Sequence, residues 1–216
     1  MALEVELKAR VDDPQALKAR LSAMGLYLGA YEKDDAYWLP AQGALFAGEN
    51  SPALPPPGLR VRRERNTRDG GGVSEHVLVT WKTGRLEGGV EINDEREFTV
   101  SDAALFEDLL ERLGLEPVIR KNKQGWAWNC PGEEGPVRAE LSNVRGLGWF
   151  LELEITEKTG GADGTRETGP HGEEAMRQQL FSLLEKLEIP RDRIESRPYT
   201  RMLAAGHGAG ANRAFQ

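Results

Sequence analysis

Several residue types and patterns are scarce in this chain of 216 residues, and each scarcity excludes a class of protein. The single cysteine, Cys130, cannot form an internal disulfide, and the three histidines make no Cys/His cluster that would bind zinc. The formal net charge of −7 argues against a general binder of nucleic acid or anionic membranes, because phosphate-rich surfaces attract basic proteins. A local basic pocket for a small anion remains compatible with this charge.

Long apolar runs are also missing. No stretch approaches the length of about 20 residues that a membrane-spanning helix needs. Strand-like sequence begins at Ala2 with no signal peptide ahead of it, so we expect a cytoplasmic protein with no membrane partner. The length and the apolar fraction of 39% predict a single globular domain with a proper core.

The chain does contain strands with charges on one face. Glu4-Val-Glu6-Leu-Lys8 alternates charged and apolar residues, and alternate side chains of a strand share a face. Several strands with one apolar and one charged face predict a closed sheet with a polar interior. The same alternation recurs in Arg60-Val-Arg62, Glu95-Arg-Glu97, Lys121-Asn-Lys123, Arg138-Ala-Glu140 and Glu152-Leu-Glu154.

Three helices are predicted. The first follows Asp12 and Asp13, begins at Pro14 and ends before Gly25; the second is capped by Ser101 and ends at Gly114. The third covers residues 173–187. The residues predicted on the apolar faces are Leu17, Leu21 and Met24 in the first helix, Leu105, Leu109, Leu110 and Leu113 in the second, and Met176, Leu180, Leu183, Leu184 and Leu187 in the third.

An internal repeat with an offset of 89 residues includes the first two helices. It maps Glu6 to Glu95 and Gly25 to Gly114, and each unit reads as a Glu-bearing strand, a capped helix and a strand that ends in an aromatic. A looser third copy starts at Glu152 and continues through the third helix to Tyr199.

The remaining segments look irregular or flexible. We expect one domain over residues 1–203 and a flexible tail over 204–216, because the tail has little to bury. The irregular segments are 40–58, which is rich in proline, 69–74, a glycine-rich hairpin tip between strands at 60–65 and 76–82, and 159–172.

The acidic residues of the charged strands suggest a metal site. Glu4, Glu6, Glu152 and Glu154 form a dense cluster if their strands are neighbours, and close carboxylates repel one another unless cations neutralise them. Mg²⁺ or Mn²⁺ would do so, since both prefer oxygen ligands. The alternative is a solvated strand face with surface ion pairs, which is the commoner situation for a single Glu-x-Glu pair.

The basic residues suggest a phosphate site. Arginine matches phosphate oxygens with two parallel hydrogen bonds, and lysine supplies a compact charge. Basic and acidic side chains facing one lumen suit a complex of a polyphosphate with a metal ion. The basic set at alternating positions is Arg60, Arg62, Lys82, Lys121, Lys123 and Arg138.

Taken together, these residues resemble the CYTH-domain proteins of the triphosphate tunnel metalloenzyme superfamily, which includes class IV adenylate cyclases, thiamine triphosphatases and inorganic triphosphatases. The resemblance covers about residues 2 to 203, and its hallmark is Glu-x-Glu-x-Lys at residues 4–8. Further matches are Asp35-Ala-Tyr37, Leu59-Arg-Val-Arg62, Trp81-Lys82, Glu95-Arg-Glu97, residues 147–154 and Tyr199-Thr-Arg-Met-Leu203.

The resemblance implies an α+β, mainly β fold, an eight-stranded antiparallel β-barrel that forms a tunnel with helices packed outside. Glu4, Glu6, Glu152 and Glu154 would hold Mg²⁺ or Mn²⁺, with Glu95 and Glu97 as further acidic tunnel residues. Lys8 and Lys82 would be catalytic. The triphosphate would be bound by Lys8, Arg60, Arg62, Lys82, Lys121, Lys123 and Arg138.

The implied activity is that of a class IV adenylate cyclase, which converts ATP to cyclic AMP and pyrophosphate. The alternatives are a triphosphatase acting on thiamine triphosphate, tripolyphosphate or nucleoside triphosphates, and a non-catalytic sensor of such molecules. Two departures bear on this choice: Lys121-Asn-Lys123 replaces Lys-x-Arg, and Ser142 stands where the family usually has an aspartate. A small-molecule triphosphate is the expected partner, nucleic acid is not, and a homodimer is left open.

Overall fold

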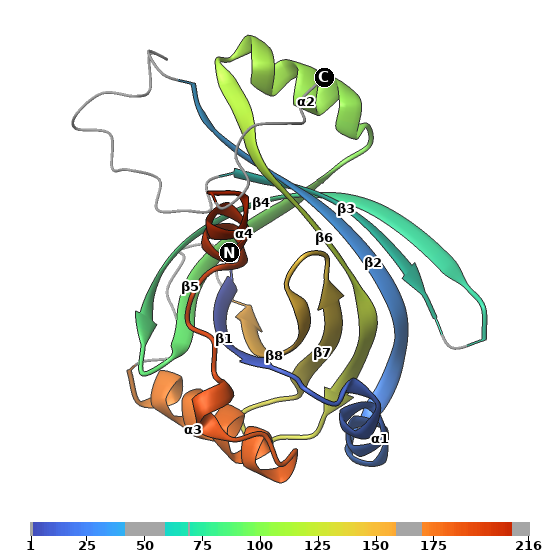
Figure 1. Cartoon of the computed structure of the whole chain (residues 1–216), viewed down its shortest axis with the longest axis vertical. Helices are drawn as coiled ribbons and strands as arrows, with labels where there is room; N and C mark the ends of the chain where they lie inside the picture. The colour runs from blue at the N-terminus through green and yellow to red at the C-terminus, as the bar shows by residue number, and fades with distance from the viewer. Residues whose placement is uncertain (1, 42–58, 69, 159–169, 209–216) are drawn as a thin grey trace.

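The computed structural model describes residues 2–41, 59–68, 70–158 and 170–208 (Figure 1). None of the described helices is both long and apolar enough to cross a membrane. The elements in chain order are β1 (Ala2–Arg10), α1 (Pro14–Met24), β2 (Leu26–Pro40), β3 (Leu59–Thr67), β4 (Val73–Glu87), β5 (Val90–Val100), α2 (Ala103–Arg112), β6 (Leu115–Cys130), β7 (Val137–Val144), β8 (Gly148–Lys158), α3 (Pro170–Lys186), the 3₁₀ turn η1 (Arg191–Arg193) and α4 (Tyr199–Gly208).

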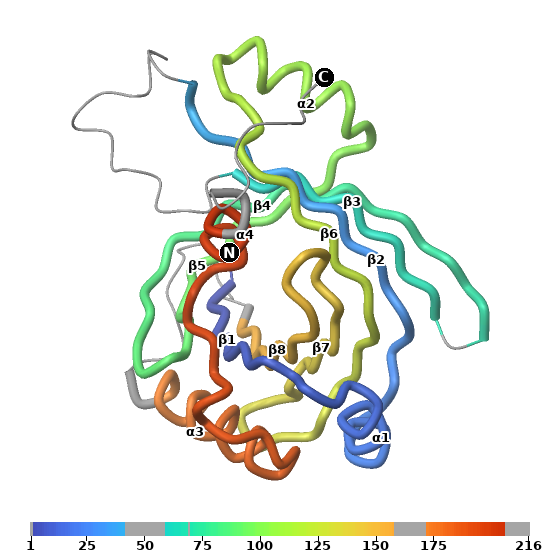
Figure 2. The backbone as a smooth tube through the Cα atoms, viewed as in Figure 1, coloured from blue at the N-terminus to red at the C-terminus, as the bar shows by residue number. Residues whose placement is uncertain are grey.

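The eight strands form a closed barrel in the order β1-β5-β4-β3-β2-β6-β7-β8, and each strand pairs antiparallel with its neighbours. Figure 2 shows β1, β8, β7, β6 and β2 following one another in this order across the view. The predicted antiparallel barrel with external helices is confirmed. Closure matters for the site because alternate residues of every strand then face one lumen.

The internal repeat is visible in the fold. β1, α1 and β2 form one strand–helix–strand unit, and β5, α2 and β6 form the other. The third copy keeps only its strand and helix, β8 and α3. Tyr199 begins helix α4 instead of ending a strand, so the predicted third unit is incomplete.

Helices α1 and α2 start at aspartate caps. Asp13 caps α1, and its side chain accepts hydrogen bonds from the backbone N–H groups of Gln15 and Ala16. Sequence analysis placed the second cap at Ser101, which is wrong by one residue: the Asp102 carboxylate accepts a hydrogen bond from the Leu105 N–H at 3.0 Å. Aspartate and serine cap equally well, so composition alone does not separate the two positions.

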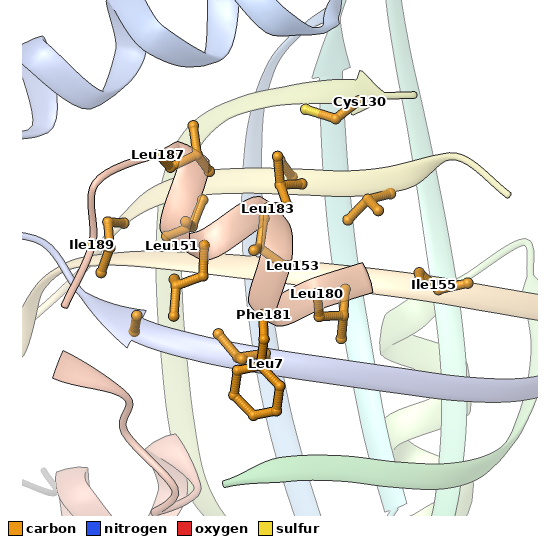
Figure 3. Close-up of a cluster of buried hydrophobic side chains, with 14 of the residues drawn as sticks. Leu7, Cys130, Leu151, Leu153, Ile155, Leu180, Phe181, Leu183, Leu187 and Ile189 are labelled. Carbon is orange, nitrogen blue, oxygen red and sulfur yellow. The ribbon is translucent and has the colours of Figure 1, made fainter. Parts of the chain in front are cut away.

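The main core lies outside the barrel, between its apolar outer surface and helices α1 and α3. Figure 3 shows Leu180, Phe181 and Leu183 of α3, and Leu187 just after it, packed over Leu153 and other strand residues. All five residues predicted to face inward in the third helix are buried, although Leu187 follows the end of α3, and so are Leu17 and Leu21 of α1. This packing directs the alternate, charged residues of β1, β7 and β8 to the lumen.

Helix α2 is oriented differently from the prediction. It buries Ala103 and Leu110 against a smaller cluster over β2 and β3, whereas Leu105, Leu109 and Leu113 are exposed. The apolar residues of this helix cover more of its circumference than one sheet face can bury. The apolar pattern therefore predicted burial of leucines that are in fact exposed.

The predicted irregular segments fall largely outside the described residues, which omit 42–58, 69 and 159–169. The hairpin tip between β3 and β4 is described except for residue 69, and Gly70 and Gly71 adopt φ values of 92° and 89° that glycine tolerates. Helix α4 runs to Gly208, across the boundary predicted after Leu203. Residues 209–216 lie outside the description.

Candidate active site

The barrel encloses a cavity of about 790 Å³. Its lining includes lumen-facing residues of the strands and residues 196–201, which lead into and begin α4. Every residue predicted for the metal or the triphosphate lines this cavity: Glu4, Glu6, Lys8, Arg60, Arg62, Lys82, Glu95, Glu97, Lys121, Lys123, Arg138, Glu152 and Glu154.

Carboxylates concentrate on β1, β5 and β8, which we call the acidic wall. Glu6 pairs in register with Glu154 of β8 on one side and with Glu91 of β5 on the other. Burial, followed by the nearby Glu152 and Glu91 carboxylates, raises the pKa of Glu6 to about 7. Burial also raises the pKa of Glu4 well above its usual value. This wall therefore holds more negative charge than its own cations neutralise.

Lys82 of β4 is paired with the acidic wall, as is Lys8 of β1. The Lys82 ammonium contacts Glu4 and lies 2.6 Å from the Glu95 carboxylate. Although burial opposes the charged form, Lys82 lowers the pKa of Glu95 to about 2, and these carboxylates raise the pKa of Lys82 in turn. Lys82 therefore keeps its positive charge at neutral pH and cannot act as a base there.

The acidic wall offers the oxygen ligands that Mg²⁺ and Mn²⁺ prefer. The raised pKa values of Glu4 and Glu6 indicate that a divalent cation would relieve their repulsion. In the described part of the chain, however, no three carboxylate, histidine or cysteine side chains are gathered closely enough to enclose an ion. Lysines hold two of the four predicted ligands, Lys82 on Glu4 and Lys123 on Glu152, so metal binding requires these contacts to open.

Arginines and lysines of β2, β3 and β6 form the opposite, basic wall. Asp35, which is 0% exposed, lies in register with both Arg62 and Lys121. It accepts two hydrogen bonds from Arg62, at 2.7 and 3.0 Å, and its carboxylate lies 2.9 Å from the Lys121 ammonium. Burial favours the neutral acid, but these two cations hold the pKa of Asp35 well below its usual range. Sequence analysis used Asp35 only as a motif residue and missed this function.

A second buried carboxylate, Glu140 of β7, joins three cations of the tunnel. It lies 2.7 Å from Lys33, 3.0 Å from Lys123 and 2.9 Å from Arg138. Lys33 and Lys123 are directly paired across β2 and β6, so Glu140 separates two like charges. Burial, despite Glu140, lowers the pKa of Lys33 to about 8.

Sequence analysis assigned no function to Lys33 or Glu140. Their spacing could have identified them, because residues two apart in a strand share a face. Lys33 is two residues before Asp35, and Glu140 is two residues after Arg138. Ser142 is fully buried, and its hydroxyl has no hydrogen-bond partner among the described residues. It pairs with Gly125 and Phe150 of the neighbouring strands and does not line the cavity.

One side of the tunnel is covered by residues 194–198, which we call the strap, and by α4 (Figure 1). The Glu195 N–H donates a hydrogen bond of 2.8 Å to the Lys8 carbonyl, and Ile194 makes an isolated bridge to Ala9. The Glu195 carboxylate binds Arg10 at 3.0 Å and Arg197 at 2.7 Å. These contacts fix the strap to the end of β1.

Beyond the strap, Tyr199 and Met202 of α4 pack with Phe150 and Val144. The Tyr199 and Phe150 rings meet edge to face, 5.1 Å apart. The Lys8 and Lys121 ammonium groups lie 4.6 and 4.9 Å from the centre of the Tyr199 ring. The predicted closing motif is thus a structural part of the tunnel.

Comparison with known proteins agrees with this architecture. The CYTH domain family matches residues 2–175. The "putative adenylate cyclase" of Methanocaldococcus jannaschii is 23% identical over 205 residues, 91% of this chain and 96% of the relative.

Solved structures show the same fold. The PH1819 protein of Pyrococcus horikoshii has a TM-score of 0.67 at 21% identity, over 94% of this chain and 98% of that chain. A Hippeastrum protein, a "putative adenylyl cyclase" with a dominant triphosphatase activity, has a TM-score of 0.56 at 15% identity, over 95% and 96% of the two chains. Since the family match spans most of its length, this chain belongs to the CYTH-domain family of the triphosphate tunnel metalloenzyme superfamily.

Proposed function

We propose that this protein is a divalent-metal-dependent enzyme that binds a triphosphate inside its barrel and cleaves it as a class IV adenylate cyclase does, from ATP to cyclic AMP and pyrophosphate. The observation that carries the proposal is the opposition of an acidic and a basic wall across one cavity. A polyphosphate needs cationic side chains, and its metal ion needs carboxylates, so the two walls suit the two parts of one ligand.

In this proposal the basic residues grip phosphate oxygens. Arg60 is suited to it because its Nε is buried and has no hydrogen-bond partner among the described residues. Arg62, Lys121 and Lys123 are held in place by Asp35 and Glu140, and Arg138 by Glu140. Side chains fixed before the ligand arrives lose little conformational freedom on binding it.

Glu4, Glu6, Glu152 and Glu154 would hold Mg²⁺ or Mn²⁺ on the acidic wall. The bound ion would neutralise charge on the phosphoryl oxygens as the leaving group departs. Lys82, displaced from Glu4 by the ion and still protonated, would turn its charge to the phosphates. Lys8 would also contact the phosphates. Its ammonium lies 3.7 Å from the Glu91 carboxylate and over the Tyr199 ring.

The reaction assignment rests on which oxygen attacks. A cyclase directs the ribose 3′-oxygen to the α-phosphorus, breaks the bond to the bridging oxygen and releases pyrophosphate. A triphosphatase directs water to the terminal phosphorus instead. Triphosphatase activity is the second candidate, and the Hippeastrum relative with its dominant triphosphatase activity is the reason to test it.

The test is incubation of the purified protein with ATP and either Mn²⁺ or Mg²⁺, with cyclic AMP, pyrophosphate, ADP and phosphate resolved chromatographically. We expect cyclic AMP and pyrophosphate in equal amounts. Phosphate and ADP without cyclic AMP would reject the cyclase and support the triphosphatase. Repeating the assay with thiamine triphosphate and tripolyphosphate then identifies its preferred substrate.

A non-catalytic sensor is a third candidate, favoured by the buried Ser142 in the position where the family resemblance places an acid. It predicts triphosphate binding without turnover, and a gain of turnover in Ser142→Asp. Rapid turnover by the native protein would exclude it.

A further inference from the structure

The first turn of α4 faces the tunnel. Pro198, Tyr199 and Thr200 line the cavity together with the strap residues before them. Figure 1 shows the chain rising from α3 past the front of the barrel to α4. The start of the helix is therefore next to the charged walls.

Two hydroxyl groups of this turn are buried. The Tyr199 and Thr200 side chains are each only 6% exposed, and no described residue meets hydrogen-bond geometry with either hydroxyl. The Tyr199 hydroxyl does lie near the Glu152 carboxylate, since burial and then that carboxylate raise the pKa of Tyr199 well above its usual value. Buried hydroxyls in native proteins are nearly always paired, so two neighbouring exceptions call for an explanation. A ligand in the tunnel that accepts hydrogen bonds provides one.

The backbone of the same turn favours an anion. The N–H groups at a helix start have no partner within the helix, and the helix dipole makes this end positive. In α4 the first bonds of the turn run from the Arg201 and Met202 N–H groups to the Pro198 carbonyl, which leaves the N–H groups before them outside the helix ladder. Phosphate groups bind at such helix starts.

Two lysine ammonium groups also lie next to the first turn of α4. Lys8 and Lys121 come from opposite walls of the tunnel, and both lie within 5 Å of the Tyr199 ring centre, at 4.6 and 4.9 Å. The ring attracts both ammonium groups and so keeps them next to the first turn of α4. Two cations thus lie beside the ring of Tyr199, and the start of α4 and the two hydroxyls belong to the same cavity-lining turn.

We propose that the first turn of α4 is a phosphate-binding element of the tunnel, in which the Tyr199 and Thr200 hydroxyls donate hydrogen bonds to phosphate oxygens held by Lys8 and Lys121. This inference rests on the proposed function, since it concerns the same triphosphate. It assigns α4 a direct contact with the ligand, in addition to its packing against Phe150 and Val144.

The test compares Tyr199→Phe and Thr200→Val with the wild type, since both variants remove a hydroxyl and keep the shape of the side chain. Tyr27→Phe is the matched control, because Tyr27 packs on Trp128 outside the barrel. Tripolyphosphate binding is measured by calorimetry in EDTA, where turnover is stopped. We expect each tunnel variant to bind about tenfold more weakly, the usual effect of one hydrogen bond to a charged group, and the control to match the wild type.

Thermal unfolding of the ligand-free proteins supplies the second readout. Replacing an unpaired buried hydroxyl by an apolar group is neutral or stabilising, so the melting temperature of both tunnel variants should stay level or rise while affinity falls. Unchanged affinity in both variants would overturn this inference and leave the proposed function standing. If the wild type itself binds no tripolyphosphate in EDTA, the inference fails, whereas the proposed function is decided by the assay with ATP and metal described above.

Discussion

The basic and acidic walls of the tunnel differ in how their charges are balanced. On the basic wall, Asp35 is shared between Arg62 and Lys121, and its pKa lies well below the usual range. On the acidic wall, burial and neighbouring carboxylates raise the pKa of Glu6 to about 7. The basic wall thus contains its own counter-ions, whereas the acidic wall leaves part of its charge for an external cation. Only the basic half of the site is therefore complete before ligands arrive.

The strongest test of this contrast is Asp35→Asn, which leaves Arg62 and Lys121 buried without their shared carboxylate. Breaking a buried charge cluster by removing one partner typically costs about 3–5 kcal/mol. Urea unfolding should show a loss of that order, together with weaker tripolyphosphate binding. A loss below about 1 kcal/mol would mean that the basic wall does not depend on its internal acid.

The second test is the pH dependence of stability without metal. The Glu6 carboxyl has a pKa of about 7 in the folded protein against 4.5 for the free group, so the folded state holds this proton more tightly. Stability should therefore fall as pH rises from about 4.5 to about 7, by on the order of 3 kcal/mol.

Two paired acids give the opposite slope at lower pH. Glu95 and Glu152 have pKa values of about 2, because Lys82 and Lys123 outweigh the effect of burial. Their contribution is lost as pH falls from about 4.5 towards 2. Urea titrations between pH 3 and 8 should thus find maximum stability near pH 4.5. A steady rise from pH 5 to 7.5 would contradict the assignment of unbalanced charge to the acidic wall.

Glu6→Gln sharpens the contrast by removing one unbalanced carboxylate. It should remove most of the loss of stability between pH 4.5 and 7, and weaken Mn²⁺ binding at least about tenfold, or ~1.4 kcal/mol. Calorimetric titration with Mn²⁺ measures the second effect. Glu97→Gln is the matched control, since its side chain is also acidic and in the tunnel but is 38% exposed. Unaltered metal affinity in Glu6→Gln would count heavily against a metal site on β1.

The smallest effect is expected outside the tunnel, on a strand that also contributes to the basic wall. Arg65 of β3 pairs with Glu75 at 3.6 Å, but the two side chains are 59% and 73% exposed. Exposed ion pairs contribute little, so Arg65→Gln should change unfolding free energy by no more than about 0.5 kcal/mol. A loss comparable to that of Asp35→Asn would show that strand position, rather than burial, decides the value of these pairs.

The barrel and the lumen-facing residues were predictable because they depend on a period of two along each strand. Lys33 and Glu140 were not, because their contacts depend on which residues face each other across β2, β6 and β7. Register shifts between Tyr27 and Gly29, and between Tyr37 and Trp38, help to set that alignment. One strand read alone contains no information about its partner's register.

The orientation of α2 was missed for a different reason. Leu105 and Leu109 continue the apolar pattern of Leu110, so the sequence describes an apolar surface wider than the one that is buried. The selection of Phe106 and Leu110 depends on the shape of the outer surface of β2 and β3, which the helix sequence does not contain.

The pairing of β1 with β8 has a consequence for synthesis on the ribosome. Lys8 and Glu152 are opposite one another across this seam, although 144 residues separate them in the chain. Contacts between such distant segments form late, because the loop entropy must be overcome first. While a nascent chain still lacks β8, its basic strands can already pair, but its acidic wall has no second half. Metal binding by the acidic wall is therefore expected only late in synthesis, after β8 has been made and has paired with β1.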